Sequence, residues 1–230
     1  MPFLQLIAIN VTTRKVRSVL TALAVAIGIM TVVAMGVLTQ SLRRTAISIL
    51  RTGEADFTVA QEGVSDVLYS ALDEEQLERL RSYPEVASVV GVLVAPKELD
   101  DEHKFFLRLG IQPEELEPFG VAIVEGRAYA PNAEDEIMLG YRAARDFDKG
   151  VGDTFQISED VFTIVGVFST GQVFGDSASM LPLTTLQAQQ RKPGNVTLAF
   201  VRVQPGTDID ALRKRIEDDS PEIATVRTQS

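Results

Sequence analysis

Pro84-Glu-Val-Ala-Ser-Val89 returns almost unchanged near the other end of the chain as Pro221-Glu-Ile-Ala-Thr-Val226. In each copy the proline ends a predicted helix, because the residue before a proline avoids the helical region, and the apolar residues behind it predict a strand. Asp73 is a good N-cap residue for the first helix, and Asp208 or Asp210 serves the second. The chain therefore contains two similar helix–strand units that are far apart in the sequence.

Each unit is also preceded by a predicted strand, at residues 56–60 in the first and 196–203 in the second. Two strand–helix–strand halves of this size can form one four-stranded sheet backed by two helices, the split βαβ arrangement. We assign the halves to residues 52–96 and 195–228 and predict an α+β domain. A chance similarity is the alternative, because the matching stretch is short.

The segment between the halves, residues 97–194, is predicted to be an inserted β-rich subdomain. One short helix is expected at residues 141–147, and a turn signal at residues 150–153 precedes a hairpin. Residues 169–179 have the composition of a loop that carries Val173 and Phe174, which either form a contact point or fold under the loop. The expected strands are 104–110, 122–124, 136–139, 154–158 and 161–167.

Residues 19–38 form a run with no charge, no Asn, no Gln and no Pro. A helix of this length spans about 30 Å, the thickness of the hydrocarbon core of a bilayer. We therefore predict a transmembrane helix over residues 19–42. A cleaved signal peptide and a buried core helix are the alternatives, and the length of the run disfavours both.

Basic residues flank this run on both sides, with Arg14, Lys15 and Arg17 before it and Arg43, Arg44 and Arg51 after it. The count of basic residues therefore does not decide the orientation, although the free amino terminus favours a cytoplasmic N-terminus. Residues 1–18 are predicted to be a cytoplasmic segment with an interfacial helix along Phe3, Leu4, Ile7 and Val11. A frayed terminus is the alternative.

The composition excludes several kinds of function. The 230 residues include 22 basic and 32 acidic ones, and none of the acidic residues precedes Glu54. Such an acidic domain argues against nucleic acid as a partner. The chain has no cysteine, no phosphate-binding loop and no Gly-x-Ser-x-Gly motif. We predict that it is not an enzyme and has no catalytic, cofactor-binding or metal site and no cofactor.

The remaining polar motifs have simpler interpretations. His103, the single histidine, follows the acidic run 100–102, and we expect both at the surface. The acidic run 217–219 is also expected to be solvated surface rather than a calcium site. Asn195-Val-Thr197 fits a glycosylation acceptor, which matters only in a eukaryotic secretory pathway.

Four blocks stand in a characteristic order: Arg17 to Ile29, with Leu20-Thr21 and Ile27-Gly28; Glu125-Gly-Arg-Ala-Tyr129 before Asp135-Glu-Ile-Met-Leu-Gly140; Gly152-Asp-Thr-Phe155 before Phe162-Thr-Ile-Val-Gly-Val-Phe168; and Leu181-Pro-Leu183 before Val201-Arg-Val-Gln-Pro-Gly206. Together they resemble MacB-like ABC transporter permeases, and the resemblance covers nearly the whole chain. It implies a cytoplasmic N-terminus and an extracytoplasmic periplasmic core domain, made of a porter-like βαβ part and a small inserted subdomain, in the cell membrane.

The resemblance also implies partners: a separate cytoplasmic ABC ATPase, a second permease copy in a dimer, membrane lipid and an extracytoplasmic adaptor. In such a system, ATP hydrolysis by the ATPase moves the extracytoplasmic domain. The family has four spans, three of them after this domain, so we expect the sequence to be a fragment of a permease. The alternatives are a single-span anchored binding or sensor domain, and a regulator of an extracytoplasmic partner that transports nothing.

Overall fold

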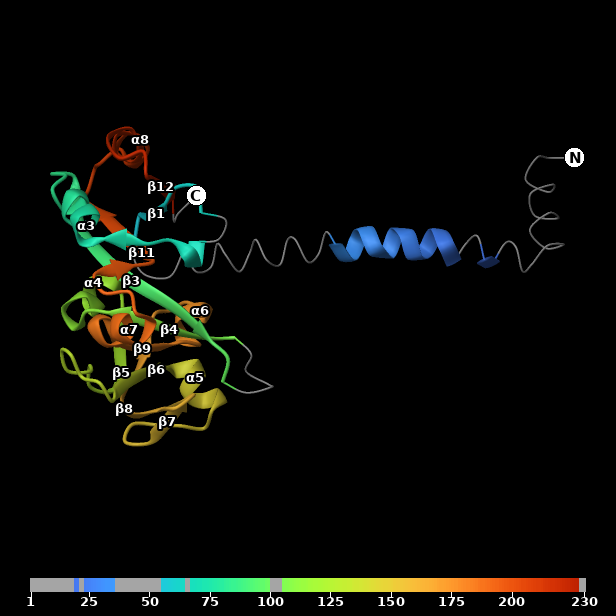
Figure 1. The fold of residues 1–230 in the computed structure, drawn as a ribbon, viewed down its shortest axis with the longest axis horizontal. Coiled ribbons are helices and arrows are strands. Elements are labelled where there is room, and N and C mark those ends of the chain that lie inside the picture. The colour runs from blue at the N-terminus through green and yellow to red at the C-terminus, as the bar shows by residue number, and fades with distance from the viewer. Residues whose placement is uncertain (1–18, 21–22, 36–54, 65–66, 100–104, 228–230) are drawn as a thin grey trace, which may run out of the picture. The chain divides into compact units, whose positions relative to one another are not determined.

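The computed structural model describes residues 19–20, 23–35, 55–64, 67–99 and 105–227 (Figure 1). The chain divides into two units, Met1–Ile47 and Ser48–Ser230, and each is described by itself. In the first unit residues 19–20 and 23–35 are helical, and their apolar side chains are exposed. Within the ranges described, no helix has both the length and the apolar character needed to cross a membrane. The interfacial helix predicted before residue 18 lies outside the described residues.

The strands of the two sequence halves lie in one sheet, in the order β12-β1-β11-β3. β1 pairs with both β11 and β12, and β11 pairs with β3, all in antiparallel fashion. This is the split βαβ order that the repeat predicts. The bounds of these strands and of the two helices between them are β1 (Phe57–Gln61), α3 (Glu74–Arg81), β3 (Val86–Lys97), β11 (Leu198–Val203), α8 (Ile209–Asp219) and β12 (Ile223–Arg227).

Local sequence explains where the two helices begin. The side chain of Asp73 accepts a hydrogen bond from the backbone N–H of Gln76, whose own side chain accepts one from the backbone N–H of Asp73. This capping box satisfies two N–H groups that would otherwise lack partners at the start of α3. At α8 the carboxylate of Asp208 accepts from the N–H of Ala211, so Asp208 rather than Asp210 is the N-cap.

The ends of the two helices are tied to each other by polar side chains. The Tyr83 hydroxyl donates to Asp219 at 2.8 Å, and Arg215 pairs with Glu85 at 2.7 Å while lying over the Tyr83 ring. Burial and the hydrogen bond to Asp219 raise the pKa of Tyr83 to about 12. The repeated segments that begin at Pro84 and Pro221 therefore lie close together in space as well as matching in sequence.

The strand β3 belongs to both parts of the domain. Its residues from Val86 to Val92 pair with β11, and its residues from Leu93 to Lys97 pair with β4 (Phe106–Ile111). The alternation of its buried residues continues across this change of partner, with Val89, Leu93 and Ala95 on one face. The inserted part therefore continues the same sheet rather than forming a separate one.

Beyond β4 the sheet runs in the order β4-β9-β6-β8-β5, and β7 pairs with β8. The pairs β4–β9 and β6–β8 are parallel, and the others are antiparallel. The strands of this part are β5 (Ala122–Gly126), β6 (Glu136–Gly140), β7 (Thr154–Ile157), β8 (Asp160–Ser169) and β9 (Ser179–Pro182). The helices are η2 (Pro113–Glu115), α4 (Leu116–Phe119), α5 (Tyr141–Asp146), α6 (Val173–Asp176) and α7 (Leu183–Gln190), and three small elements lie in the first part: η1 (Val67–Tyr69), β2 (Leu72–Asp73) and β10 (Asn195–Val196).

Apolar side chains cover both faces of this long sheet. One layer joins the sheet to α3, α5, α7 and α8, and it includes residues from both parts, such as Phe57, Leu80, Ile137 and Leu186. The opposite layer contains Phe119 of α4, with its ring against that of Phe200 at 5.0 Å between centroids. Figure 1 shows the helices of the two parts distributed along the sheet. Both layers run through the inserted part, so its core is shared with the first part.

Several predictions from the sequence need correction. The strand predicted at 196–203 is divided, because the side chain of Thr197 turns inward and accepts a hydrogen bond from the N–H of Val94. The segment 169–179 is not entirely loop, since it contains α6 and the start of β9. Residues 183–190, which the sequence analysis assigns to no helix or strand, form the helix α7. The hairpin β7–β8 is present, and Ser158 takes the positive φ of 59° for which glycine is the usual residue.

Candidate functional site

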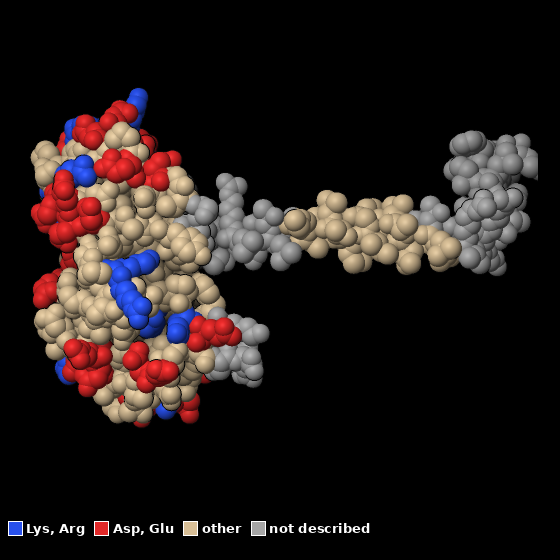
Figure 2. All heavy atoms as spheres, in the orientation of Figure 1, with Lys and Arg blue, Asp and Glu red and all other residues tan. Residues whose placement is uncertain are grey.

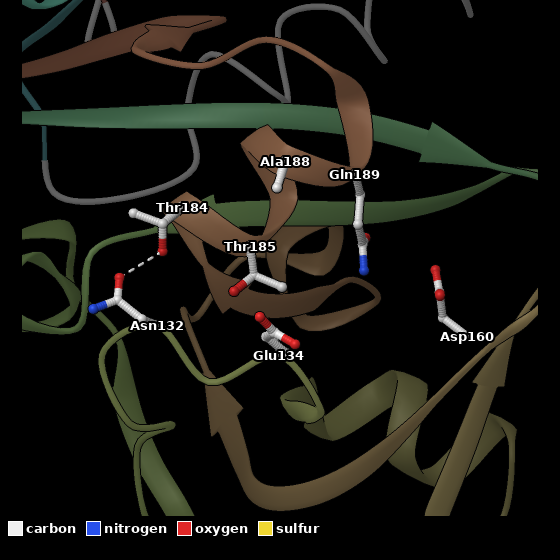
Figure 3. A pocket seen from close by; sticks show the side chains of 7 residues that line it. All are labelled: Asn132, Glu134, Asp160, Thr184, Thr185, Ala188 and Gln189. Atoms are coloured by element: carbon white, nitrogen blue, oxygen red, sulfur yellow. Dashed lines mark hydrogen bonds between the residues drawn. The ribbon is translucent and has the colours of Figure 1, made fainter.

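The described part of the chain has a pocket of about 360 Å³ in the inserted subdomain. Its walls come from three places: the loop between β5 and β6, the start of β8, and the outer side of α7 (Figure 3). Most of the lining side chains are polar, and two are carboxylates. The lining residues are Asn132, Glu134, Asp160, Thr184, Thr185, Ala188 and Gln189.

The helix α7 lies close to the sheet because β4 has a glycine beneath it. A Cβ on Gly110 would lie 3.1 Å from side-chain atoms of Leu186 and 3.3 Å from the Cα of Leu183. These two leucines are buried, so the opposite side of α7, with Thr184, Ala188 and Gln189, is left to line the pocket. The close approach of helix and sheet therefore sets the position of one pocket wall.

The loop that forms the second wall is held at its base by Glu136. Its carboxylate accepts two hydrogen bonds from Arg127, at 2.6 and 3.0 Å, and one from the backbone N–H of Ala130 at 2.8 Å. These contacts lower the pKa of Glu136, with the hydrogen bond from Arg127 as the largest cause. The loop between Arg127 and Glu136 is thereby closed into a fixed turn.

Two hydrogen bonds attach this loop to α7. The Thr184 hydroxyl bonds the Oδ1 of Asn132 at 2.9 Å, as Figure 3 shows, and the Thr185 hydroxyl donates to the carbonyl of Ala133 at 2.8 Å. Glu134, the next residue, makes neither a hydrogen bond nor an ion pair with the residues that the structure describes. Its carboxylate is presented to the pocket by a backbone that is fixed on both sides.

Arg108 of β4 contacts the pocket residue Gln189 and is itself 4% exposed. Its Nη1 donates to the Oε1 of Gln189 at 2.9 Å, while its Nε has no hydrogen-bond partner. Burial lowers the pKa of the guanidinium, and the charge of Asp160 partly offsets that effect. Because a guanidinium has only donors, this contact fixes which end of the Gln189 amide is oxygen. The amide nitrogen then faces the space between Thr185 and Asp160 (Figure 3).

The loop that carries Val173 and Phe174 is fixed from inside by Asp176. This carboxylate is buried and accepts from the N–H of Thr170 at 2.6 Å and from its hydroxyl at 3.1 Å. Phe174 packs against the core, whereas the side chain of Val173 is 65% exposed. Each of the two interpretations of this loop therefore holds for one residue. Phe174 folds under the loop, and Val173 remains available for contact.

The acidic run 217–219 has structural partners. Glu217 accepts a hydrogen bond from the N–H of Thr225, and Asp219 accepts one from Tyr83. Within the described ranges, no three His, Cys, Asp or Glu residues are grouped so that they could hold a metal ion. His103 and residues 100–102 lie outside the described residues. In the sequon that begins at Asn195, the hydroxyl of Thr197 is buried and bonded to Val94.

The pocket carries almost no signal in the sequence, from which we predict no site residues. Its residues come from segments that are separate in the sequence, and none of them forms a motif. The contact that Arg108 makes with Gln189 joins positions 81 residues apart. A buried arginine within the apolar strand that ends at Ile111 was the one local signal, because an apolar strand rarely carries an arginine without a partner.

Comparison with known proteins identifies relatives of the fold. The periplasmic region of MacB from Actinobacillus actinomycetemcomitans has 14% sequence identity and a TM-score of 0.59, over 77% of this chain and 91% of that one. The extracellular domain of the noncanonic ABC-type transporter YknZ from Gram-positive bacteria has 13% identity and a TM-score of 0.56, over 74% of this chain and 99% of that one. No curated protein matches the sequence.

The sequence itself matches a family profile over most of its length. The profile is described as the MacB-like periplasmic core domain, and the match covers residues 18–219. This range includes both strand–helix–strand halves apart from β12, together with the whole inserted part. The chain therefore belongs to the family of the MacB-like periplasmic core domain.

Proposed function

We propose that the chain is the extracytoplasmic domain and first membrane span of a permease subunit in a MacB-like ABC system. In this proposal a separate cytoplasmic ATPase hydrolyses ATP, and the chain converts the resulting movement of the membrane spans into movement of its extracytoplasmic domain. The observation that carries the proposal is the match of residues 18–219 to the family, together with a sheet that continues through both parts of the domain.

The structure supports such a transmission in a specific way. The chain enters the sheet on β1 and leaves it on β12, and these strands are neighbours. Movement of membrane segments attached to these two strands would act on one end of the sheet. The twelve-residue strand β3 is hydrogen-bonded to β11 along one half and to β4 along the other, so it would carry the movement into the inserted part.

The membrane span is the second component of the proposal. Residues 23–35 are helical and carry no charged side chain. The hydroxyl of Thr31 donates to the carbonyl of Ile27 at 2.9 Å, so this polar group is satisfied within the helix, as lipid requires. Together with the uncharged residues on both sides, this supports a single span over residues 19–42 with the N-terminus in the cytoplasm and the main domain outside.

The partners follow from the same proposal. The chain would pair with a second permease copy, contact membrane lipid, and present its outer surface to an extracytoplasmic adaptor. Figure 2 shows acidic side chains over the upper and lower parts of the visible face of the described domain and a smaller group of basic side chains near its middle, so this face offers no broad basic area for nucleic acid. Because the sequence has no phosphate-binding loop, we propose that the chain itself hydrolyses no ATP.

Co-purification tests the proposal. The tagged protein would be isolated from native membranes in mild detergent, and its partners identified by mass spectrometry. We expect a polypeptide with a phosphate-binding loop among them, and ATP hydrolysis only when that polypeptide is present. Recovery of the intact protein without any ATPase would overturn the proposal.

A membrane-anchored binding domain is the second candidate function. The polar pocket between α7 and the loop before β6 favours it, because a domain that only transmits force does not need such a pocket. The co-purification experiment separates the two, since an anchored binding domain would be isolated without an ATPase.

A further inference from the structure

We propose that the pocket between α7, β8 and the loop before β6 binds a small organic cation, in which an ammonium or guanidinium group lies beside a hydrogen-bond acceptor. The proposal concerns the chemistry of this pocket and does not depend on the membrane or on an ATPase. It rests on three groups that line the pocket and are labelled in Figure 3: the carboxylates of Glu134 and Asp160 and the side-chain amide of Gln189.

The two carboxylates provide the negative side of the site. Neither the carboxylate of Glu134 nor that of Asp160 makes a hydrogen bond or an ion pair with any residue in the described part of the chain. The charge of Asp160 acts on the buried guanidinium of Arg108, so one of the two negative charges has a positive charge nearby. One carboxylate therefore remains uncompensated at a concave surface, where a bound cation would gain two charge-assisted hydrogen bonds.

Gln189 provides a donor on the opposite side. Its oxygen is occupied by the Nη1 of Arg108 at 2.9 Å, so its NH₂ group is the part that remains for a ligand. A ligand that satisfies this site must therefore offer an acceptor, such as a carbonyl or hydroxyl oxygen, in addition to its positive group. Arg108 is a positioning residue here, because it holds the amide in the orientation that the ligand would meet.

The orientation of the Gln189 amide also argues against a metal ion in this pocket. A hard divalent cation takes six or more oxygen ligands in most protein sites. Gln189 turns its nitrogen rather than its oxygen toward the pocket, which leaves only the two carboxylates as strong ligands. Within the ranges described, no group of metal-binding side chains forms around them. An organic cation uses both the acceptors and the donor, and a metal ion does not.

The size and rigidity of the pocket suit a small molecule or one basic side chain. Its volume of about 360 Å³ lies within the roughly 300–1,000 Å³ that is usual for small-molecule pockets. Glu136 holds the loop, and Asn132 and Ala133 are bonded to α7, so the walls are formed before a ligand arrives. Because the walls are preformed, ligand binding causes a smaller loss of conformational entropy in the protein.

Ligand-observed saturation-transfer NMR on the chain of residues 1–230 in detergent tests the proposal. The probes are Nα-acetyl-lysinamide and Nα-acetyl-argininamide, compared with Nα-acetyl-norleucinamide, which lacks the positive charge but keeps the amide acceptors. We expect the two cations to bind and the norleucine compound to bind at least several-fold more weakly. A lysine-centred tripeptide amide that binds more tightly than the single residue would indicate a peptide as the source of the cation, and a tripeptide that binds no better would indicate a free small molecule.

Variants locate the binding. Glu134→Gln and Asp160→Asn keep the size of each side chain and remove its charge, and each is expected to weaken cation binding about two- to fivefold. Glu159→Gln is the matched control, because Glu159 precedes Asp160 in the same turn but does not line the pocket. Unchanged thermal unfolding would show that the variants fold.

Three results with the organic probes would overturn the proposal: no binding of either cation to the unmodified chain, equal binding of the norleucine compound, or equal weakening by Glu159→Gln. The first two need no variant, so a failure of a variant to fold would not protect the proposal. Calcium chloride serves as a separate probe, and saturable calcium binding that displaces the cations would show a metal site instead.

Discussion

Phe57 and Arg227 are directly paired across the antiparallel strands β1 and β12. Phe57 is the first residue of β1, and Arg227 is the last of β12, so the chain enters and leaves the sheet at the same end. The pairing also closes the outer side of β1, which has β11 as its other neighbour. The strand that comes last in the domain therefore completes the environment of the strand that comes first.

A chain that stops after Ser220 should lose much of the stability of the domain. It lacks β12, so β1 loses five paired residues and the buried side chain of Ile223 disappears from the core. We expect the free energy of unfolding to fall by about 3 kcal/mol or more. Urea unfolding followed by circular dichroism measures this change. A chain that stops after Arg227 is the control and should unfold like the original, and equal stability of all three chains would contradict the role given to β12.

Gly140→Ala should destabilise the inserted part severely. A Cβ at this position would lie 2.3 Å from the backbone oxygen of Asp176, a distance that neither backbone can tolerate without moving. We expect the free energy of unfolding to fall by about 3 kcal/mol, measured by urea unfolding. Gly150→Ala is the matched control, because no atom lies within 4 Å of a Cβ there, and it should change stability by less than about 1 kcal/mol. Similar effects of the two variants would be evidence against the close approach at Gly140.

The ion pair between Arg127 and Glu136 should make stability depend on pH in the acidic range. Folding lowers the pKa of Glu136, chiefly through its hydrogen bonds with Arg127, whereas in the unfolded chain the pKa is ordinary, about 4.3. The contribution of the pair is therefore present in full above that pH and is lost as the pH falls through the lower pKa of the folded state. A carbon-detected NMR titration of the Glu136 carboxyl measures the folded pKa.

Arg127→Gln should raise the pKa of Glu136 toward its ordinary value and reduce the loss of stability below about pH 4. Arg145→Gln is the control, because Arg145 is exposed and its ion pair, with Asp146, has a distance of 4.0 Å. It should leave the pKa of Glu136 unchanged. If both variants shift this pKa equally, the shift comes from the net charge of the domain and not from the ion pair.

Ile29→Arg should prevent stable membrane insertion if the first helix is a span. This residue lies near the middle of the uncharged run, where an arginine costs about 3 kcal/mol on scales of translocon insertion. Extraction of membranes with alkaline carbonate measures the result: the original chain and an Ile29→Leu control should stay in the membrane fraction, and Ile29→Arg should not. Release of the original chain by carbonate would contradict a transmembrane helix.

Signals that lie within a few residues of one another determined the first part of the fold. Asp73 with Gln76, and Asp208, specify where two helices begin, and Pro84 and Pro221 specify where they end. Such signals act through neighbouring backbone groups, so they can be recognised in the sequence. The repeat then implied that β1, β3, β11 and β12 share a sheet, which the pairing of these strands confirms.

Five of the six strands that the structure describes in the inserted part were predictable, β9 (Ser179–Pro182) was not, and neither was the assembly. The parallel pairs β4–β9 and β6–β8 join segments that are far apart along the chain, and alternation of apolar residues does not say which strand lies beside which. The helix α7 was missed because Leu183 and Leu186 are the only buried leucines in its eight residues, too few for a recognisable helical repeat. Its position depends on Gly110, a residue on another strand.

The sequence by itself thus determined the two halves, the uncharged N-terminal run and the resemblance to the family, because each depends on residue type and spacing along the chain. Only the tertiary structure decided that β3 passes through both parts of the domain and that Val173 is exposed while Phe174 is partly buried against the core. It alone brought Glu134, Asp160 and Gln189 together around one pocket. The physical reason is that these arrangements arise from packing and hydrogen bonds between distant segments, such as the contact of Arg108 with Gln189, and no local pattern encodes such contacts.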